Sequence, residues 1–237
     1  MLKLEQLSFQ VPADGTNLEI IDSVDLEVPT GSFTVITGPN GGGKSTLARL
    51  IMGIEKPTGG RILFKGEDVT ALSIPERAKR GIGYAFQQPP RFKGLTVRRL
   101  LSLAAGEPLS KDACSAYLTA VGLDPEEYLN REMDASLSGG EAKRVEIATL
   151  MARRAELVIF DEPEAGIDLW SFSMLVESFR TLVGEDRRSV IVISHQERIM
   201  QLADTMVIIA GGKVCQSGTR DEILPKLLGE VDGRKEA

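Results

Sequence analysis

A glycine-rich stretch near the N-terminus has the residue types needed to hold the phosphates of a nucleotide. It fits the pattern G-x-x-x-x-G-K-[ST] at every fixed position, with the residues Gly38, Pro39, Asn40, Gly41, Gly42, Gly43, Lys44, Ser45 and Thr46. Glycines let successive backbone N–H groups turn toward an anion, and a lysine here can reach the β- and γ-phosphates. The Ser45 hydroxyl can ligate Mg²⁺. A glycine-rich turn with a chance lysine is the simpler alternative.

The surroundings of this phosphate loop (residues 38–46) favour the chemical interpretation. Residues 32–37 are largely apolar and β-branched, which predicts a buried strand. Apolar residues recur at helical spacing over 47–51, and Gly53 offers a natural end to a helix. A strand, a glycine loop and a helix in this order predict a nucleoside triphosphate site, because the positive end of the helix dipole points at the phosphates.

An acidic pair follows a second apolar segment. Residues 157–160 are all apolar, and Asp161 and Glu162 come directly after them. A buried strand that ends beside the phosphate loop would point a carboxylate at bound Mg²⁺, so we expect Asp161 to contact the ion directly or through a water. Glu162 would then polarise the attacking water as a general base. A solvated acidic turn is the alternative, and the pair gains its weight from the phosphate loop earlier in the chain.

His195 is the only histidine of the chain and directly follows the apolar segment 189–194. A lone histidine is more often structural than catalytic. At this strand end, however, a neutral imidazole could donate a hydrogen bond to a γ-phosphate oxygen and orient the water, so we predict a functional role.

The stretch Ser138, Gly139, Gly140 and Glu141 opens a predicted helix. Exposed N–H groups and a hydroxyl at a helix N-terminus can bind a second anion. A serine and a glutamate three residues apart also satisfy an ordinary capping box. Local physics leaves both interpretations open.

Taken in order, these motifs closely resemble those of the nucleotide-binding domains of ATP-binding cassette (ABC) ATPases. The resemblance covers essentially the whole chain and rests on GPNGGGKST, Phe86-Gln87, LSGGE, LVIFDEP, Ala165-Gly166-Ile167-Asp168 and Ser194-His195. It implies an α/β fold with a P-loop NTPase core, an antiparallel β subdomain and a helical subdomain. Within a single domain 1–237, we expect the core and β subdomain at 1–88 and 155–229, a helical lobe with the LSGGE motif at 89–154, and a polar tail at 230–237.

The resemblance also implies residue roles. Gln87 would join core to helical lobe, sense the γ-phosphate and Mg²⁺, take part in catalysis and couple to a partner. In a head-to-tail dimer, the 138–141 motif of one chain would close over ATP bound to the other, which answers by analogy the question left open above. Asp168 would lie at the dimer seam. Val11 stands where the family usually has an aromatic residue stacked on adenine, so base stacking should be weak.

Two kinds of ABC ATPase share features with this chain. Similarity to SufC-type ATPases of the Suf iron–sulfur cluster assembly system is carried by residues 71–78, 85–89, 138–144 and 195–199. We therefore expect a SufC-like assembly ATPase, and this similarity implies a soluble scaffold protein as partner. The alternative is the ATP-binding subunit of a membrane transporter, with a permease docking near Gln87. A third possibility, a non-catalytic ATP switch, is disfavoured by Glu162 and His195.

Composition narrows the choice of partner and compartment. The net charge of −6 argues against nucleic acid, whose phosphate backbone requires a basic surface. No apolar run approaches the ~20 residues of a membrane-spanning helix, and residues 1–10 lack a signal-peptide core. One histidine and two cysteines are too few ligands for a zinc or iron–sulfur site. We therefore expect a cytoplasmic protein, peripheral to the membrane if it serves a transporter.

Hydrophobic periodicity predicts the remaining elements. Strands are expected at 2–8, 18–21, 24–28, 61–65, 81–86, 205–210 and 213–217. Helices are expected at 73–80, over most of 96–132, at 139–154 and at 170–183. A turn is expected at 13–15, and the residues after Gly229 should be frayed.

Overall fold

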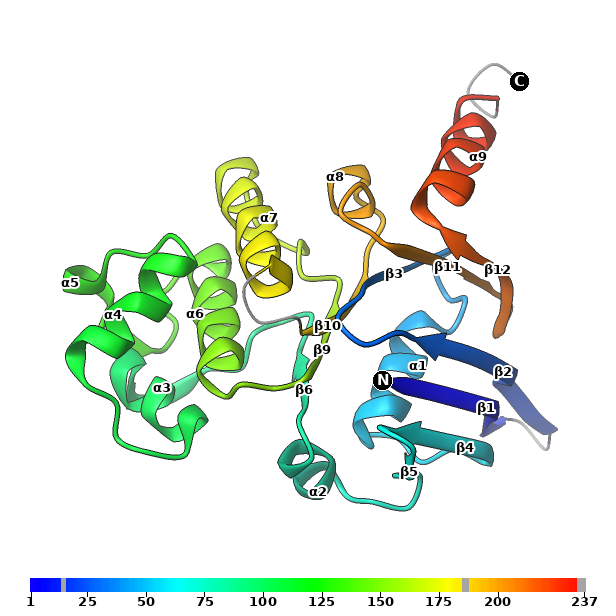
Figure 1. The fold of residues 1–237 in the computed structure, drawn as a ribbon, viewed down its shortest axis with the longest axis horizontal. Coiled ribbons are helices and arrows are strands. Elements are labelled where there is room, and N and C mark those ends of the chain that lie inside the picture. The colour runs from blue at the N-terminus through cyan, green and yellow to red at the C-terminus, as the bar shows by residue number, and fades with distance from the viewer. Residues whose placement is uncertain (14–15, 185–187, 234–237) are drawn as a thin grey trace.

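The computed structural model describes residues 1–13, 16–184 and 188–233, and its centre is a six-stranded sheet (Figure 1). The strand order is β12-β11-β3-β10-β9-β6, in which β12 is antiparallel to β11 and the other neighbours are parallel. Its strands are β3 (Phe33–Thr37), β6 (Ile82–Ala85), β9 (Leu157–Asp161), β10 (Ser189–Ile193), β11 (Thr205–Ala210) and β12 (Lys213–Thr219). Every residue of β3, β9 and β10 is buried, as expected for parallel strands covered on both faces.

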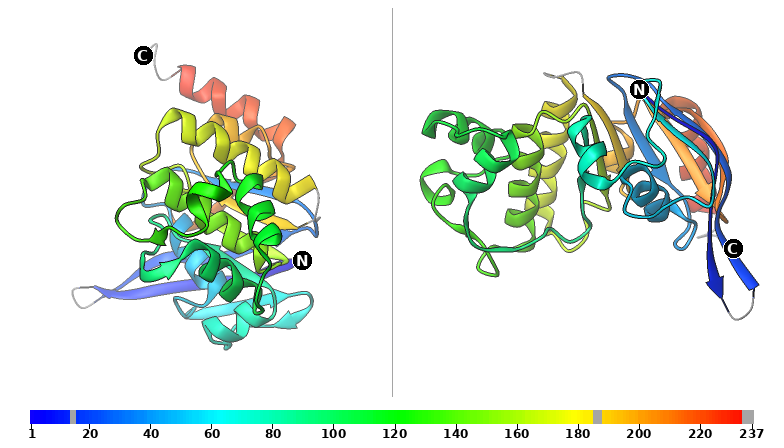
Figure 2. Two further views of the ribbon diagram at one scale, coloured as in Figure 1. Left: turned by 90° about the vertical axis from the view of Figure 1, so that its left-hand side faces the viewer. Right: turned by 90° about the horizontal axis from the view of Figure 1, so that it is seen from below.

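An antiparallel sheet of four strands lies beside this core. Its order is β2-β1-β4-β5, with β1 (Leu2–Ala13), β2 (Thr16–Val28), β4 (Gly59–Phe64) and β5 (Glu67–Asp68). The two predicted strands 18–21 and 24–28 form one strand, because the pairing of β1 with β2 shifts register instead of ending. Gln6 and Ser23 absorb the shift with φ angles of 50° each. The β1–β2 hairpin projects from the body (Figure 2), and residues 14–15 of its predicted turn lie outside the described residues.

Helix α1 (Lys44–Met52) packs between the two sheets, in one of the two buried apolar clusters. It ends at Gly53, whose φ of 83° is the left-handed cap conformation. The buried Arg77 of α2 (Ile74–Lys79) donates to the carbonyls of Leu50 at 2.6 Å and Ile51 at 2.8 Å. This arginine satisfies backbone acceptors that the end of a helix leaves unpaired.

The second apolar cluster joins the other face of the core sheet to a helical lobe. The lobe and the long helix that links it to the core comprise α3 (Val97–Ala105), α4 (Lys111–Ala120), α5 (Pro125–Tyr128), α6 (Gly139–Ala152) and α7 (Leu169–Gly184) (Figure 1). The predicted helical stretch 96–132 is interrupted at Gly106 and Gly122, whose φ angles are 76° and 69°. The sequence also missed two short antiparallel strands, β7 (Phe92–Thr96) and β8 (Glu132–Met133).

The C-terminal part adds the short α8 (Glu197–Met200) and a helix that was not predicted, α9 (Arg220–Gly233). Ile223 and Leu224 anchor α9 in the larger apolar cluster. Of the predicted polar tail, residues 230–233 therefore form the end of α9, and 234–237 lie outside the described residues. No helix in the described part of the chain is long and apolar enough to cross a membrane.

Candidate active site

The phosphate loop connects β3 to α1 and curves around a cavity of about 290 Å³ lined by Ile20, residues 40–46 and Glu162. Several of its positions leave no room for a side chain, and at two of them the backbone angle also favours glycine. A Cβ atom at Gly38, where φ is 133°, would lie 2.0 Å from the carbonyl oxygen of Ile209. A Cβ atom at Gly43, where φ is 101°, would lie 2.8 Å from the Ile21 side chain. The glycines of the motif are thus required by close backbone approach as well as by conformation.

Lys44 begins α1 and is 4% exposed. Its Nζ donates to the carbonyl oxygens of Gly38 at 2.8 Å and Pro39 at 2.9 Å. Burial lowers the pKa of this ammonium group, and the carboxylates of Glu162 and Asp161 partly oppose that shift. The charge is therefore held against the loop with two acidic groups nearby.

Asp161 ends β9 and is 3% exposed. Its two oxygens accept hydrogen bonds from the Ser45 hydroxyl at 2.8 Å and the Tyr84 hydroxyl at 2.9 Å. Burial, followed by the proximity of Asp161, raises the pKa of Tyr84, so this phenol stays a donor at neutral pH. Tyr84 could not be predicted from the sequence, since only the pairing of β6 with β9 brings it to the carboxylate.

The pair of Ser45 and Asp161 fits Mg²⁺ chemically. The ion prefers hard oxygen ligands and usually takes one or two from the protein, completing its shell with phosphate oxygens and waters. The described residues contain no cluster of three or more histidine, cysteine or acidic side chains that could hold a metal alone. A hydroxyl beside a carboxylate at the phosphate loop fits a site in which the protein and the phosphates together supply the Mg²⁺ ligands.

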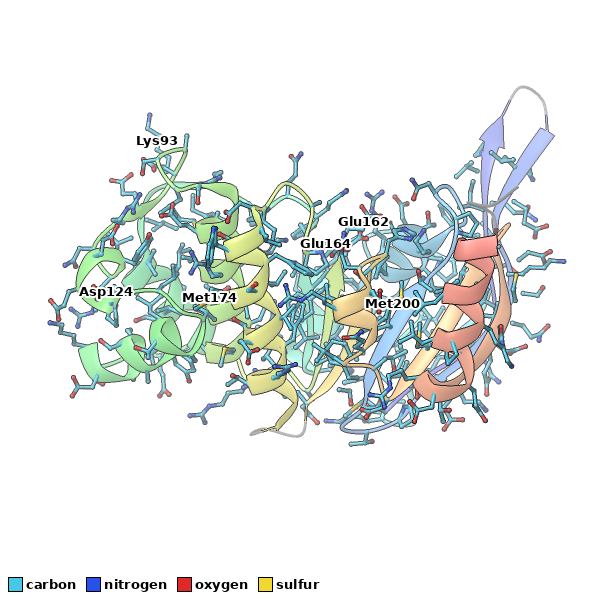
Figure 3. The ribbon with its side chains drawn as sticks, turned by 90° about the horizontal axis from the view of Figure 1, so that it is seen from above. Lys93, Asp124, Glu162, Glu164, Met174 and Met200 are labelled. Atoms are coloured by element: carbon cyan, nitrogen blue, oxygen red, sulfur yellow. The ribbon has the colours of Figure 1, made fainter. Side chains whose placement is uncertain are left out.

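Glu162 directly follows β9 and lines the cavity. Its φ of 43° is unusual for a residue other than glycine, and its N–H donates to the carbonyl of Ile193 at 3.0 Å. The Gln87 side chain, just after β6, donates from Nε2 to Glu162 Oε2 at 2.8 Å. Two of the three residues predicted to take part in catalysis, Gln87 and Glu162, are therefore in direct contact. Figure 3 shows Glu162 near Glu164, between the core and the helices of the lobe.

His195 follows β10 and lies within electrostatic reach of the same groups. Burial and then the positive charge of Lys44 lower the pKa of the imidazole, while Glu162 raises it less. The neighbouring Ser194 donates its hydroxyl to Glu164 Oε1 at 2.5 Å. Burial raises the pKa of Glu164, and this residue links the turn after β10 to the segment after β9. No sequence motif singles out Glu164.

Other predicted residues lie outside the cavity. Ser138 caps α6: its hydroxyl accepts from the N–H of Glu141 at 3.2 Å, and its own N–H donates to Glu141 Oε2 at 2.7 Å. This is the complete capping box that the sequence allowed. Val11 pairs with Leu18 in the β1–β2 hairpin, and Ile20 is the hairpin residue that lines the cavity. Ile20 was not among the predicted site residues.

A Cβ atom at Gly139 would lie 3.1 Å from the carbonyl oxygen of Gly166, and one at Gly140 would lie 2.5 Å from Ser171 Oγ. The glycines of the 138–141 motif thus pack closely against the segment that leads into α7. Asp168, in that segment, accepts hydrogen bonds from the first turn of α7.

A buried ion pair holds the start of the Gln87 segment to α6. Lys143 and Glu146 are 1% and 7% exposed, and their charged groups are 3.0 Å apart. Lys143 donates to the carbonyl of Phe86, and the N–H of Phe86 donates to Glu146 at 3.0 Å. The N–H and the carbonyl of Phe86, the residue before Gln87, are thus both held by the helix that begins with the 138–141 motif.

Replacing Glu146 by leucine should lower the free energy of unfolding by about 3–5 kcal/mol, because it leaves the Lys143 ammonium buried without its counter-charge. Urea unfolding measures this change. The double variant Lys143→Met/Glu146→Leu is the control and should lose less stability than the single variant. A double variant that loses the sum of both single effects would contradict this interpretation.

Comparisons with known proteins agree with this geometry. The family model described as ABC transporter matches residues 21–165. An uncharacterized ABC transporter ATP-binding protein of Methanocaldococcus jannaschii is 43% identical over 215 residues, which cover 87% of this chain and 86% of that protein. The glycine betaine/carnitine/choline transport ATP-binding protein OpuCA of Bacillus subtilis is 33% identical over 230 residues, which are 94% of this chain but only 59% of OpuCA.

Among solved structures, the dimeric ATP-binding cassette MJ0796 bound to ADP and Pi superposes with a TM-score of 0.83 at 24% identity. The match covers 93% of this chain and 99% of that one. This likeness confirms the predicted α/β fold with its P-loop core. From the motifs, the fold and the matched relatives together, we conclude that the chain belongs to the ABC transporter family, as an ATP-binding domain of that family.

Proposed function

We propose that this chain binds and hydrolyses ATP as the nucleotide-binding subunit of an ABC membrane transporter, in a head-to-tail dimer. The observation that carries the ATPase part is the convergence of four segments on the phosphate loop and Glu162, which line one cavity. The phosphate loop, the end of β9, the Gln87 segment and the turn after β10 bring together Lys44, Asp161, Glu162 and His195, within contact or electrostatic reach.

The phosphate loop and Lys44 would bind the β- and γ-phosphates, with the loop N–H groups and the ammonium charge as donors. Ser45 and Asp161 would hold Mg²⁺, assisted by Gln87, and the bound ion supplies positive charge that neutralises the phosphates. Ile20 and Val11 offer the base aliphatic surface without an aromatic ring to stack on. Binding should therefore depend on the phosphates more than on the base.

Glu162 would accept the proton of the attacking water, and Gln87 would hold the glutamate carboxylate in position. The lowered pKa of His195 keeps the imidazole neutral at pH 7, so one ring nitrogen can donate a hydrogen bond while the other accepts. A neutral donor beside Lys44 can orient the γ-phosphate without adding a second full charge.

The cavity would be half of a site. Ser138, Gly139, Gly140 and Glu141 lie outside it, although the family resemblance assigns them to ATP. A second copy related by a two-fold axis would bring its 138–141 motif over this phosphate loop, with Asp168 near the seam. The dimeric state of MJ0796 supports this arrangement through the shared fold.

The membrane partner would dock on the helical lobe near Gln87. Three large apolar side chains are exposed on this segment and lobe: Phe86 at 46%, Phe92 at 41% and Leu103 at 54%. Single exposed apolar side chains are common on protein surfaces. Here one of them, Phe86, directly precedes Gln87, so a permease bound to this surface could act on Gln87. Together with the transport names of the relatives, they favour a permease as partner and a location peripheral to the membrane.

Affinity purification from detergent-solubilised membranes and from the soluble fraction tests the partner. Capture of a multi-span permease is expected, and capture should be lost with Phe92→Glu. The matched control is Leu18→Glu, which alters a side chain that is 53% exposed on the projecting hairpin and should leave capture intact. Capture of a soluble, cysteine-bearing scaffold in place of a permease would overturn the transporter assignment.

That second outcome would support a SufC-like assembly ATPase, the other candidate. It is favoured by the sequence similarity over 71–78, 85–89 and 138–144. The relatives described above are named for ABC transport and give it no support. With a net charge of −6, a nucleic-acid partner remains disfavoured under either assignment.

Replacing Tyr84 by phenylalanine should raise the Mg²⁺ concentration needed for half-maximal ATPase activity by about tenfold, because Asp161 loses the hydrogen bond that orients it. Activity measured across a Mg²⁺ titration tests this. Tyr117→Phe, on α4 of the helical lobe, is the control and should leave the titration unchanged. An unchanged Mg²⁺ requirement in Tyr84→Phe would argue against a positioning role for the phenol.

A further inference from the structure

Two neighbouring side chains at the start of α7 are the most exposed large apolar groups of the described residues. Leu169 is 72% exposed and Trp170 is 85% exposed. Trp170 is also the only tryptophan of the chain. We call these two residues the α7 cap. The function described so far gives them no role.

The backbone of the α7 cap is held in place. The Asp168 carboxylate accepts hydrogen bonds from the N–H of Trp170 at 2.9 Å, the N–H of Ser171 at 3.0 Å and the Ser171 hydroxyl at 2.7 Å. This is the bonding of an N-cap residue, and the next turns of the helix are anchored by buried Phe172, Leu175 and Val176. A fixed helix turn therefore presents the indole to solvent, so the exposure does not come from an unstructured loop.

The residues that directly follow the α7 cap contact two parts of the nucleotide machinery. On one side, Ser171 packs so closely on Gly140 that a Cβ atom there would lie 2.5 Å from Ser171 Oγ. On the other side, the guanidinium of Arg198, three residues after His195, lies 5.5 Å from the centre of the Phe172 ring. Arg198 also donates to Ser173 Oγ at 3.3 Å. The start of α7 is thus in contact with both the 138–141 motif and the segment after β10.

We propose that the α7 cap binds a second copy of this chain and forms an apolar centre of the dimer interface. The inference rests on the proposed head-to-tail dimer, in which each chain's 138–141 motif covers the partner's phosphate loop. In a two-fold dimer the surface between a chain's own phosphate site and its own 138–141 motif must cross the axis and face its copy. Leu169 and Trp170 begin the helix whose next residues contact both of these regions, so we place them on that surface.

The chemistry of the cap suits such a contact. A tryptophan buries on the order of 150–250 Å² and is among the residue types that dominate interface energies when they become desolvated. Because both chains contribute the same surface to a two-fold interface, one substitution removes two tryptophans from the dimer. Salt screens interactions between charges and so weakens only the electrostatic part of the association. An apolar contact beside the charged ATP site would keep its strength at high salt.

Sedimentation velocity on the Glu162→Gln background tests the proposal, because slowed hydrolysis should let the ATP-bound dimer accumulate. Adding Trp170→Ser is expected to weaken ATP-dependent dimerisation by about tenfold or more, with Trp170→Phe retaining most of it. Ile74→Ser, the loss of an apolar side chain that is 41% exposed on α2, is the matched control and should dimerise normally. Binding of a fluorescent ATP analogue should be equal in all variants, since the phosphate loop is untouched.

Fluorescence of the single tryptophan gives an independent measurement. ATP, but not ADP, should shift the emission of Glu162→Gln to shorter wavelength in step with dimer formation, because the indole leaves water. The role of the α7 cap would be overturned if the ATP-dependent dimer formed equally well with Trp170→Ser and the Trp170 emission of Glu162→Gln stayed unshifted. The proposed dimer would then still stand. Failure of Glu162→Gln itself to dimerise with ATP would overturn the proposed dimer and this inference with it.

Discussion

Glu162→Gln is expected to lower the ATP turnover rate by about a thousandfold, while ATP still binds and the dimer accumulates. The amide has nearly the shape of the carboxylate, and its carbonyl can still accept the hydrogen bond from Gln87 Nε2 that is 2.8 Å long in the native chain. The substitution should also leave the backbone at position 162, with its unusual φ of 43°, unchanged. Only the capacity to take a proton from water is lost, so single-turnover hydrolysis should slow as much as steady-state turnover.

Glu164→Gln is the control for this substitution. Glu164 lies two residues away and is hydrogen-bonded to Ser194, but it does not line the cavity. Because burial raises the pKa of Glu164, the neutral amide is a mild replacement there, and turnover should fall much less. If Glu162→Gln hydrolysed ATP at the native rate with the partner present, the general base would have been assigned to the wrong residue.

Lys44→Ala should weaken ATP binding by about a hundredfold or more and thereby abolish measurable turnover. The substitution removes a buried positive charge facing the phosphates. It also leaves the carbonyl oxygens of Gly38 and Pro39 without the donor that now lies 2.8 Å and 2.9 Å from them. Isothermal titration with ATP and with ADP measures the loss, which should be larger for ATP because the γ-phosphate loses its contact as well.

Two further variants at this position separate charge from packing. Lys44→Met keeps the length of the side chain and fills the 4%-exposed site, so it should preserve stability but lose binding as alanine does. Lys44→Arg keeps the charge and should retain more affinity than methionine. Equal affinity of the methionine and native chains for ATP would show that the lysine only braces the loop.

The sequence was informative wherever a function depends on contiguous residues. The phosphate loop, with its flanking strand and helix, and the apolar run before Asp161 could each be predicted from one short segment. Their physical requirements, glycine geometry and burial on both faces of a sheet, leave a direct mark on residue type. The side chains that support the site leave no such mark. Tyr84 acts through the strand pairing of β6 with β9, and Lys143 and Glu146 hold a backbone segment 57 and 60 residues away in sequence.

The errors in the predicted elements have a similar origin. Residues 18–21 and 24–28 look like separate strands because a register shift breaks the alternation, yet the neighbouring strand keeps them in one ladder. Helix α9 lacks a clear apolar stripe and contains Pro225, and it is held mainly by Ile223 and Leu224. Neither outcome can be seen without the neighbouring chain segments, because tertiary contacts override local preference there.

The strand order of the core sheet has a consequence for local stability. β3, β9 and β10 have strands on both sides, whereas β6 is the edge strand that leads to Gln87. Opening of a sheet proceeds most easily from its edges, so the Gln87 segment should rearrange before the central strands that carry the phosphate loop and Asp161. The contacts that such a rearrangement must break are the bonds of Lys143 and Glu146 to Phe86, so a partner that moves the Gln87 segment would act against this buried pair.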